Sequence, residues 1–350
     1  ALSAVVLARH LEERLGRIVL PVFWIASEDH DWAEVNHAYV LDPANRLRRV
    51  ELPDSGENRP IPMSERVLAG DLESLCDEIA QSIAPQKQTQ AYAKRVLDPY
   101  RTPGKTMARA FQEALAAILG DFDLLFVDAA DPALKKISAR VLWESVAEAE
   151  GEEVRLQERT REIEALGYTP QVGILEGATN VFVHGPQGRQ RLYRRGADYV
   201  VRGRKGTIGR EELLAELESG PERFSPNVLL RPVVESVVLP TLAYVGGPGE
   251  IAYFAQATAL FERHGIRAPA IIPRFSALVL DEGTERTLKQ LGFDETDLGE
   301  TREALIDSLV RREMPAEAQE TLETLRRSLV EAFDALAEQV EGIDPTLVGA

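Results

Sequence analysis

Short apolar runs alternate along this chain with segments of helical periodicity. In the first half, residues 17–26 and 123–128 have the length expected of buried parallel strands. In the second half, runs at residues 241–245 and 268–273 are separated by a helical segment at 250–264. Strands that alternate with helices predict an α/β fold with a doubly wound parallel sheet. The other elements predicted in these blocks are a short strand at 36–41 and helices at 106–119, from about 132, and at 228–238.

The segment between the two blocks has a different sequence pattern. A charged helical stretch at residues 141–166 comes first, and Gly185 and Gly188 then enclose a Pro-Gln pair that is typical of a hairpin turn. Short candidate strands lie at 171–175, 180–184, 190–194 and 199–201. An antiparallel unit between two parallel blocks indicates an insertion.

Three parts of the chain follow from these patterns. We predict a Rossmann-like core split between residues 1–150 and 226–280, an α+β domain inserted at 151–225, and a helical segment at 281–350. Apolar residues of the last part have the alternating three- and four-residue spacing of a coiled-coil seam. These residues are Leu322, Leu325, Leu329, Ala332 and Leu336.

The charge balance limits the partners of the chain. With 40 basic and 57 acidic residues among 350, the formal net charge at pH 7 is −17. This charge disfavours binding to nucleic-acid phosphates and to anionic membranes. No apolar run of about 18 residues occurs that could span a membrane. We therefore expect a cytoplasmic protein that binds neither nucleic acid nor membranes.

The single cysteine, Cys76, excludes an intrachain disulfide and a thiolate metal cluster. It lies in a stretch with apolar residues at helical spacing, so we interpret it as a small buried residue of a helix. We predict no tightly bound metal.

The densest cluster of ionisable residues directly follows the first predicted strand. In open α/β sheets, ligands bind at the carboxyl ends of the strands, so these residues are candidate site residues. They could transfer protons, hold an ammonium group or bind a cation. The alternative is that Ser or Asp only caps a turn here. The cluster consists of Ser27, Glu28, Asp29, His30 and Asp31, and Asn36 and His37 open the next strand.

A second candidate is a glycine-rich turn between a strand and a helix. It contains Gly246, Gly247 and Gly249, whose spacing does not fit the dinucleotide fingerprint G-x-G-x-x-G. Such a turn lets the backbone approach a ligand closely. Glu250 stands where a phosphate would bind, which favours an amine or a hydroxyl-rich ligand. A tight connection with a glutamate in the first helical turn is the alternative.

Two arginines at the ends of elements suit a carboxylate or a phosphate. Arg231 borders an apolar helix, and Arg274 follows a buried strand. An ion pair, for example with Glu235, is an equally open interpretation of Arg231. The Gly-Lys-Thr sequence that ends at Thr106 is not a phosphate loop, because Pro99 stands where the motif requires Gly. We expect Thr106 to cap the following helix.

The predicted hairpin carries a basic run within this acidic chain. We interpret the run as a solvated face of the hairpin, and attraction of an anionic substrate is the alternative. Its members are Arg189, Arg191, Arg194, Arg195, Arg202, Arg204 and Lys205.

Four ordered motifs resemble those of the bacillithiol biosynthesis cysteine-adding enzymes, the cysteine ligase or bacillithiol synthase family. Asp128 and the sequence Asp131-Pro-Ala-Leu-Lys135 are similar as well, and the resemblance covers most of the chain. The four motifs are Val22-Phe-Trp-Ile-Ala-Ser-Glu-Asp-His-Asp31 with Asn36-His37, Phe224-Ser-Pro-Asn-Val-Leu-Leu-Arg-Pro232, Tyr244-Val-Gly-Gly-Pro-Gly-Glu-Ile-Ala-Tyr253 and Pro273-Arg-Phe-Ser276.

The resemblance implies a carbon–nitrogen ligase that joins L-cysteine to glucosaminyl-malate and forms bacillithiol, a low-molecular-weight thiol. It implies a nucleotide-binding core similar to that of class I aminoacyl-tRNA synthetases, with an inserted connecting domain. A helical coiled-coil domain is implied to form a homodimer. ATP or ADP is the implied nucleotide, with activation of a carboxylate before an amine attacks it.

The resemblance also implies the site residues. Glu28 and Glu250 are expected to hold an ammonium group, and Arg231 or Arg274 the carboxylates of malate. The implied catalytic residues are Glu28, His30, Asp31 and His37. The residues implied to bind substrate or nucleotide are Ser27, Asn36, Asn227, Arg231, Gly246, Gly247, Gly249, Glu250, Arg274 and Ser276.

The two ends of the chain depart from the family pattern. The family's Thr-Gly-Gln-Gln segment, which resembles a phosphate-gripping motif, does not precede the helix that opens at Ala1, and the coiled coil stops soon after Val340. We therefore expect a fragment, with activity and dimerisation belonging to the full-length protein. Two alternatives stay open: a metal-dependent hydrolase that uses the cluster from Glu28 to Asp31, and a non-catalytic nucleotide-binding module.

Overall fold

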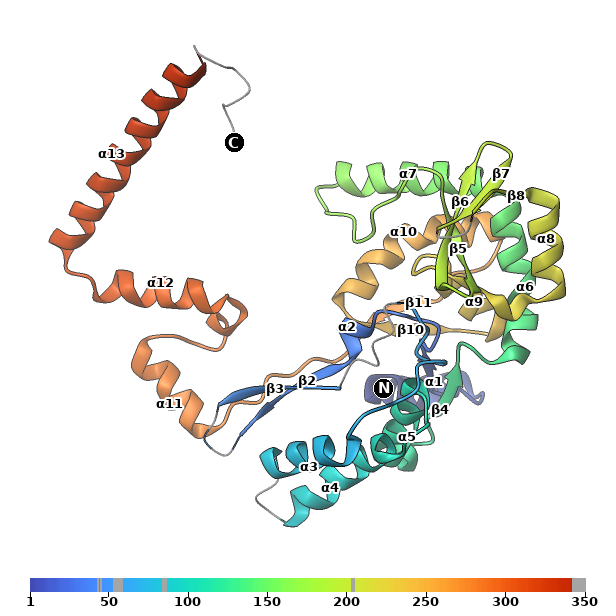
Figure 1. Cartoon of the computed structure of the whole chain (residues 1–350). Helices are drawn as coiled ribbons and strands as arrows, with labels where there is room; N and C mark the ends of the chain where they lie inside the picture. Colours follow the sequence, from blue (N-terminus) through green and yellow to red (C-terminus); the bar gives the residue numbers. More distant parts are fainter. Residues whose placement is uncertain (43, 45, 53–58, 84–86, 203–204, 342–350) are drawn as a thin grey trace. The chain divides into compact units, whose positions relative to one another are not determined.

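The computed structural model describes the chain except for residues 43, 45, 53–58, 84–86, 203–204 and 342–350 (Figure 1). It contains two compact units, Ala1–Phe275 and Ser276–Ala350. Arg204 of the basic run lies outside the described residues. None of the helices in the described ranges combines the length and the apolar character that crossing a bilayer requires.

The first unit contains two pairs of parallel strands. β1 (Val22–Ile25) pairs with β4 (Leu125–Asp128), and Ile25 lies opposite Asp128. β10 (Ala243–Gly246) pairs with β11 (Ala270–Pro273). Helices precede or connect these strands, as the alternating pattern predicts. They are α1 (Leu2–Leu15), α5 (Met107–Leu119), α6 (Pro132–Ala147), α9 (Arg231–Val238) and α10 (Pro248–His264).

The predicted α/β class is confirmed, but the strand predicted at 36–41 was placed in the wrong sheet. β2 (His37–Leu41) forms an antiparallel hairpin with β3 (Leu47–Glu51). The connection between them is too short for the crossover that parallel pairing requires. Within the described residues, the parallel strands form two separate pairs instead of one continuous doubly wound sheet.

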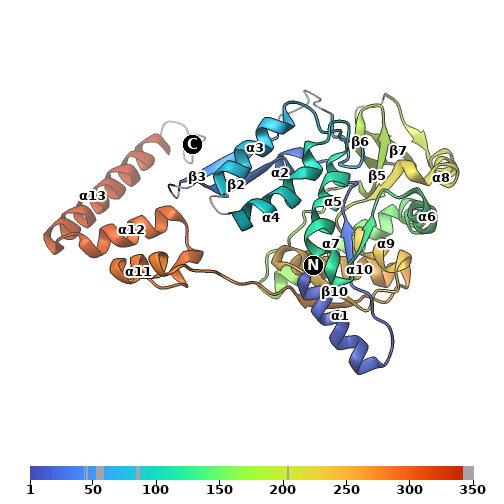
Figure 2. The ribbon, with the colours of Figure 1, turned by 90° about the horizontal axis from the view of Figure 1, so that it is seen from below.

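Helices α3 (Leu72–Ile83) and α4 (Lys87–Leu97) lie beside α5 in the first unit (Figure 2). Cys76 of α3 packs with Ala93 of α4, and burial raises the pKa of its thiol. The structure therefore places Cys76 as the sequence predicts, as a small buried residue of a helix. Thr106 accepts a hydrogen bond from the backbone N–H of Arg109 at 3.3 Å and so caps α5, as expected.

A five-stranded antiparallel sheet lies between the two α/β blocks in the sequence. Its order is β8-β7-β6-β5-β9, and α6 and α8 pack against each other beside it (Figure 1). The strands are β5 (Ala178–Gly185), β6 (Gly188–Arg195), β7 (Asp198–Val201), β8 (Ile208–Gly209) and β9 (Phe224–Pro226). The accompanying helices are α7 (Ala149–Ala165) and α8 (Arg210–Ser219).

Two details of this region differ from the sequence prediction. The single helix predicted at 141–166 is two helices, because the backbone at Glu148 departs from helical geometry between α6 and α7. The strand predicted at 171–175 is absent from the described structure. There the N–H of Val172 donates to the side chain of Gln256 at 2.9 Å, so the segment is held by a helix instead of a neighbouring strand.

The largest hydrophobic core joins this sheet to the helices around it. Leu142 of α6, Leu192 of β6, Leu213 of α8 and Leu260 of α10 are fully buried in one cluster. Burial of each such side chain stabilises the fold by about 1.5–3 kcal/mol. The sheet region thus shares its core with α10 of the second α/β block. The inserted domain at 151–225 stays a prediction.

The second unit is helical in its described part. Asp281 and Thr301 cap the first two helices through their side-chain oxygens. Leu322, Leu325 and Leu329 are more than half exposed and form an apolar stripe, and their coiled-coil pairing stays a prediction. The three helices are α11 (Glu282–Leu291), α12 (Arg302–Glu313) and α13 (Ala316–Glu341).

Candidate functional site

The carboxyl ends of β1 and β4 bring Ser27 and Asp128 into contact. The buried Ser27 hydroxyl donates to the Asp128 carboxylate. The backbone N–H of Ala130 lies 3.1 Å from Ser27 Oγ and 2.9 Å from Asp128 Oδ1. These bonds fix the loop after β1 against the loop after β4. Because the first loop also carries Glu28 and His30, the bonds position both side chains at the ends of the strands.

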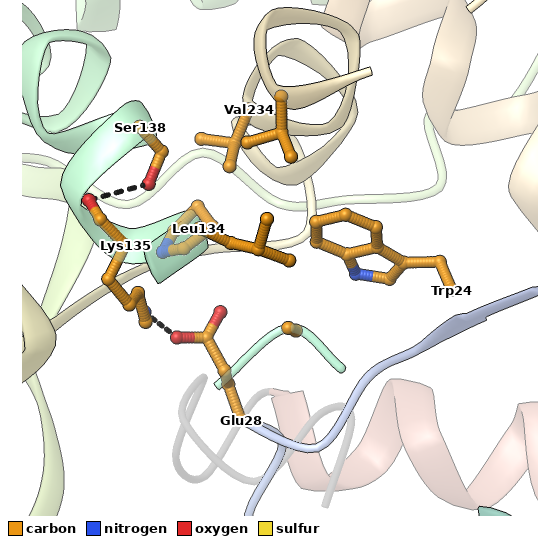
Figure 3. Close-up of a pocket in the computed structure, with 9 residues that line it drawn as sticks. Trp24, Glu28, Leu134, Lys135, Ser138 and Val234 are labelled. Carbon is orange, nitrogen blue, oxygen red and sulfur yellow. Dashed lines mark hydrogen bonds and ion pairs between the residues drawn. The ribbon is translucent and has the colours of Figure 1, made fainter. Parts of the chain in front are cut away.

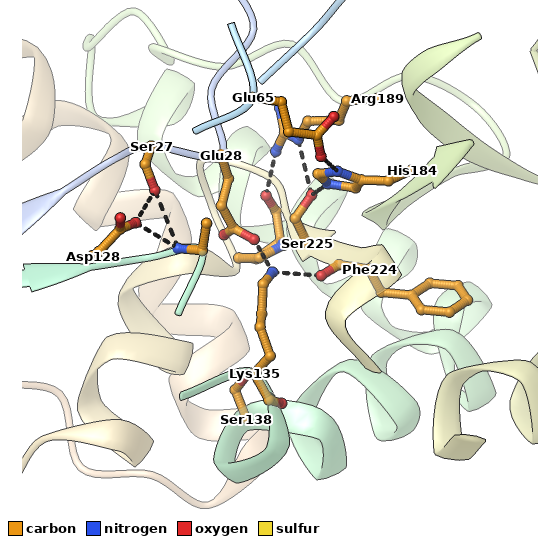
Figure 4. A network of polar contacts seen from close by, with 12 residues as sticks. Ser27, Glu28, Glu65, Asp128, Lys135, Ser138, His184, Arg189, Phe224 and Ser225 are labelled. Atoms are coloured by element: carbon orange, nitrogen blue, oxygen red, sulfur yellow. Dashed lines mark hydrogen bonds and ion pairs between the residues drawn. The ribbon is translucent and has the colours of Figure 1, made fainter. Parts of the chain in front are cut away.

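Glu28 forms a buried ion pair with Lys135 from the first turn of α6 (Figure 4). The exposed fractions of the two residues are 8% and 4%. Lys135 Nζ also donates to the carbonyl oxygen of Phe224 at 2.5 Å and so links α6 to β9. Burial, followed by the positive charge of Arg189, lowers the pKa of Lys135. Lysines with a lowered pKa are concentrated at functional sites.

A small pocket lies beside this ion pair (Figure 3). The indole N–H of Trp24 has no hydrogen-bond partner among the described residues. The pocket therefore combines apolar walls with a carboxylate, an ammonium group and an unpaired N–H donor. It is lined by Trp24, Glu28, Ala129, Leu134, Lys135, Ser138, Pro226, Val234 and Val238.

Arg189 of β6 connects the β5–β6 hairpin to the loop after β1. Its Nε donates to Ser225 Oγ at 2.9 Å, and Nη2 donates to the carbonyl oxygen of Pro226 at 2.7 Å (Figure 4). Its Nη1 lies 3.1 Å from His30 Nδ1. The guanidinium lies over the ring of Phe182, 4.0 Å from the ring centre. Burial lowers the pKa of Arg189 to about 10, so the group is still charged at neutral pH.

His184 extends the same set of contacts. Its Nε2 lies 3.0 Å from Ser225 Oγ, and its Nδ1 lies 3.9 Å from a carboxylate oxygen of Glu65. Burial, followed by the charges of Lys135 and Arg189, lowers the pKa of His184 to about 3. His184 is therefore neutral at physiological pH. We call the connected residues the basic network: Glu28, His30, Lys135, His184, Arg189 and Ser225.

The other members of the first predicted cluster have different surroundings. Asp31 is exposed at the N-cap of α2 (Trp32–Val35), without a capping bond from its side chain. Asn36 donates to Glu51 Oε1 at 2.8 Å, and its Oδ1 lies 3.1 Å from His37 Nδ1. The His37 ring packs edge-on against Tyr39. The contacts of Asn36 and His37 thus belong to the β2–β3 hairpin.

Arg231 and Glu235 form an ion pair on α9, which is one of the two interpretations of Arg231 that the sequence left open. Arg231 also donates to the hydroxyl of Tyr253 and, at 3.3 Å, to that of Tyr244. Burial raises the pKa of Glu235, although the Arg231 charge opposes this rise. The guanidinium of Arg231 is therefore occupied within the protein.

Both carboxylate oxygens of Glu250 are occupied at the start of α10. Oε1 accepts from the hydroxyl of Tyr244 at 2.5 Å, and Oε2 accepts from the N–H of Gly247 at 2.7 Å. A Cβ at position 247 would lie 3.2 Å from Cζ of Arg274, and one at Gly246 would lie 3.2 Å from Cβ of Glu250. Glycine at position 247 therefore leaves room for the Arg274 guanidinium beside the turn.

Arg274 is exposed directly after β11. Its backbone N–H donates to the carbonyl oxygen of Gly246 at 2.8 Å, which keeps it at the carboxyl end of β10. No acidic side chain pairs with its guanidinium in the part of the chain that the structure describes. Gly249 faces open space. The exposed side chain of Arg274 is thus the one of the two predicted arginines that is open to an anionic ligand.

Two predicted binding residues have other positions. The side chain of Asn227 is buried, where Oδ1 accepts from the N–H groups of Leu229 and Leu230 at 3.0 and 2.9 Å. It also donates to Asn180 at 2.9 Å, so Asn227 organises the turn before α9. Ser276 is the first residue of the second unit, and its assignment stays a prediction.

Sequence reasoning did not assign four residues of the basic network to the site, namely Lys135, His184, Arg189 and Ser225. Lys135 and Ser225 lie inside motifs that carry the family resemblance, which is a signal that could have found them. Arg189 was assigned to a solvated face, but this was wrong, because only 8% of the residue is exposed. Arg194 of the same run pairs with Glu153 at 3.1 Å.

The described residues include no group of three or more His, Cys, Asp or Glu side chains placed to bind one metal ion. Glu28 pairs with Lys135, and His30 faces Arg189, so cations already occupy the positions next to these two side chains. The observed contacts thus give the hydrolase alternative no set of metal ligands in this part of the chain.

Comparison with known proteins gives one family. The family model "Bacillithiol biosynthesis BshC, N-terminal Rossmann-like domain" matches residues 1–275. A protein of Koribacter versatilis (strain Ellin345) named "Putative cysteine ligase BshC" is 36% identical over 355 residues, which cover 100% of this chain and 64% of the relative. Proteins with the same name from Solibacter usitatus (strain Ellin6076) and Bacillus cereus (strain AH187) are 33% and 27% identical, over 100% and 99% of this chain. The chain spans 64% of the length of each of these relatives.

Proposed function

The chain belongs to the bacillithiol biosynthesis BshC family, and from this membership we propose that the full-length protein is a carbon–nitrogen ligase that joins L-cysteine to glucosaminyl-malate. The names of the relatives, which describe cysteine ligases, support this reaction class. The structural observation that supports a reaction site in this chain is the basic network. It gathers a buried carboxylate and several nitrogen groups at the carboxyl ends of β1 and β4.

The reaction forms an amide bond between the carboxyl carbon of one substrate and the amine nitrogen of the other. One carboxylate oxygen must leave, and the amine must lose a proton. We propose that ATP activates the carboxylate by placing a phosphoryl or AMP group on that oxygen, so that the oxygen leaves with phosphate or AMP. The protein then has to bind anions, keep water out and offer hydrogen bonds to the developing negative charge.

The described side chains support a division of this work. His30 would face a substrate carboxylate, because its imidazole lies in the loop after β1. Lys135 would hold Glu28, with which it is paired, and would not bind the substrate itself. Arg274 would bind a malate carboxylate or a phosphate through its exposed guanidinium. Arg231 and Glu250 lose the ligand-holding roles expected of them, since their charged atoms are bonded inside the protein.

Beside the glycine-rich turn, the phosphates of a nucleotide fit better next to Arg274 than at the start of α10. The N–H of Gly247, the N-cap residue of α10, already donates to Glu250, so the start of α10 offers less to a phosphate than a free helix N-terminus does. The Arg274 guanidinium beside the same turn has the charge and the room that an anionic group needs. We therefore place the nucleotide phosphates at Arg274.

The architecture belongs to the same proposal. We propose that the Rossmann-like core resembles that of class I aminoacyl-tRNA synthetases and that the five-stranded sheet region is the inserted connecting domain. In the full-length protein, the apolar stripe of α13 would continue as a coiled coil and form the homodimer.

The test is an assay of the full-length protein with L-cysteine, glucosaminyl-malate and ATP. We expect bacillithiol by mass spectrometry, together with either AMP and pyrophosphate or ADP and phosphate, which identifies the activated group. Omission of each substrate in turn is the control. Tight nucleotide binding without product would contradict the ligase and support the non-catalytic alternative.

Variants connect that activity to the site. Replacement of His30 and Asp31 by alanine should lower the rate of product formation by at least about 100-fold if these residues touch the reacting groups. Asp121→Ala, on the short helical turn after α5, is a surface control that should leave the rate unchanged. An unchanged rate in the double variant would contradict the placement of the site after β1.

A further inference from the structure

We propose that Arg189 is a positioning residue that holds His30 as a neutral imidazole with its proton on Nε2. His30 then offers an N–H group, and no base, to an anionic oxygen of the substrate. The part about the substrate rests on the proposed ligase function. The state of His30 follows from the geometry of this chain alone.

The first step concerns what each partner can donate. A guanidinium has N–H donors and no acceptor, and it keeps its protons at all physiological pH values. Arg189 Nη1 lies 3.1 Å from His30 Nδ1, so Nδ1 must supply a lone pair. A neutral imidazole with an acceptor at Nδ1 carries its proton on Nε2. Protonation of His30 would set an N–H of one cation against an N–H of another.

The second step is that Arg189 is held in place. Its other nitrogens are bound by Ser225 Oγ and by the carbonyl oxygen of Pro226, and the plane of the group lies over Phe182. Its backbone N–H donates to the carbonyl oxygen of Pro60 at 2.8 Å. Because the side chain is bonded at both ends and buried, it cannot turn away to let His30 take up a proton.

The third step weighs the charges that face His30. Burial lowers the pKa of His30 most, and the charges of Arg189 and Arg191 lower it further. Asp29, whose carboxylate lies 3.9 Å from Nδ1, and Asp31 raise the pKa, each by less than Arg189 lowers it. The balance lowers the pKa of His30. The neutral form expected from the hydrogen bond is thus also the form that the surrounding charges favour at neutral pH.

The fourth step is the consequence for chemistry. With Nδ1 occupied by Arg189 and a proton on Nε2, His30 has no lone pair to accept a proton from an amine. It can donate from Nε2 to a carboxylate or phosphate oxygen and stabilise negative charge that develops there. The β5–β6 hairpin therefore sets the role of a residue that lies 159 positions earlier in the chain.

The test is a measurement of the imidazole nitrogens of the protein by nuclear magnetic resonance. The chain has five histidines, so a sample with ¹⁵N in the histidine rings gives few signals, and His30→Gln identifies those of His30. We expect a protonated Nε2, an unprotonated Nδ1 and a titration midpoint below the ordinary value of 6.5. A protonated Nδ1 in the unmodified chain would overturn the proposal, without the need for a variant of the buried arginine.

Two variants separate the hydrogen bond from the charge. Arg189→Met removes both, so the proton should distribute over the two ring nitrogens and the midpoint should rise by roughly one pH unit. Arg191→Gln removes a cation that lies 4.9 Å from the centre of the same Phe182 ring and, in the described structure, makes no hydrogen bond to His30. It should raise the midpoint less and leave the proton on Nε2. Equal effects of the two variants on the tautomer would contradict the proposal.

Kinetics of the full-length protein provide the second readout. Arg189→Met should lower kcat by about 100-fold with a smaller change in KM, and the loss should shrink as pH falls, because a protonated His30 again carries a proton on Nε2. Arg189→Lys keeps a donor and should restore part of kcat. If the full-length protein shows no ligase activity, the proposed function fails while the resonance result still decides the state of His30.

Discussion

At the residue scale, buried charge is the main feature of the candidate site. Glu28 and Lys135 neutralise each other, Arg231 is neutralised by Glu235, and Arg189 is bonded to neutral acceptors. Removal of one partner of a buried pair leaves an unpaired charge, which costs on the order of 3–5 kcal/mol. Changes at these residues should therefore affect both the candidate site and the free energy of unfolding. For His184, this free energy also depends on pH.

His184 should make the fold less stable as pH falls below neutrality. Its pKa is 6.5 in an unfolded chain and about 3 in the fold, so the unfolded state binds more protons between these two values. Stability therefore decreases as pH falls through 6.5, on the order of 1 kcal/mol per pH unit. Urea unfolding between pH 7 and 5 should show a shallower decrease for His184→Gln than for the unmodified chain.

The matched control for this experiment is His10→Gln, at an exposed position within α1. This variant should keep the pH dependence of the unmodified chain. Identical slopes for His184→Gln and the unmodified chain would show that His184 is not kept neutral by folding.

At the element scale, the β5–β6 hairpin brings Arg189 to the site by docking against the segment that precedes α3. Gly188 has φ +82°, and a Cβ there would lie 2.6 Å from the carbonyl oxygen of Pro60. Arg59, the neighbour of Pro60 in the chain, also contacts the hairpin and donates to the carbonyl oxygen of Pro186 at 2.9 Å. The close approach of two backbones is thus possible because position 188 has no side chain.

Gly188→Ala should undock the hairpin. The left-handed backbone alone costs about 1–2 kcal/mol with alanine, and the contact with Pro60 adds about 1–3 kcal/mol of overpacking. Gly196→Ala is the matched control, since Gly196 also has a positive φ, +63°, but faces open space. Urea unfolding should therefore show a larger loss for Gly188→Ala, and equal losses would contradict the docking contact. Only Gly188→Ala should change the His30 signals.

At the scale of the whole molecule, the net charge of −17 and the placement of the basic residues act together. Two cations of the hairpin contribute less to the surface charge, because Arg189 is buried and Arg194 pairs with Glu153. A small anionic substrate can still reach Arg274, which is exposed. A long polyanion would meet a repulsive surface over most of its length.

We therefore expect no binding of transfer RNA, even though the proposed core resembles that of the synthetases. Fluorescence anisotropy with labelled tRNA should show no saturable change at physiological salt, because few phosphates can be neutralised. The same titration at low salt is the control for weak electrostatic contact. Saturable binding in the micromolar range at physiological salt would contradict this expectation.

Local patterns predicted the elements well and their partners poorly. The helices at 106–119 and 250–264 and the strands at 123–128 and 241–245 were found within a few residues, because periodicity and caps are properties of neighbouring residues. The strand at 36–41 was also found, but not its antiparallel partner. Pairing depends on what lies beside a strand in space, and a sequence pattern of one strand does not contain that information.

The sequence by itself determined the α/β class, the position of Ser27, Glu28 and His30 after the first strand, and the family, since motifs and periodicity are carried by adjacent residues. Only the tertiary structure decided which partner each charge has. Lys135 could have faced solvent, and Arg189 was expected to do so, but folding buries both beside Glu28 and His30. The physical reason is that a buried charge is stable only with a specific partner, and these partners come from distant elements that meet only in the folded chain.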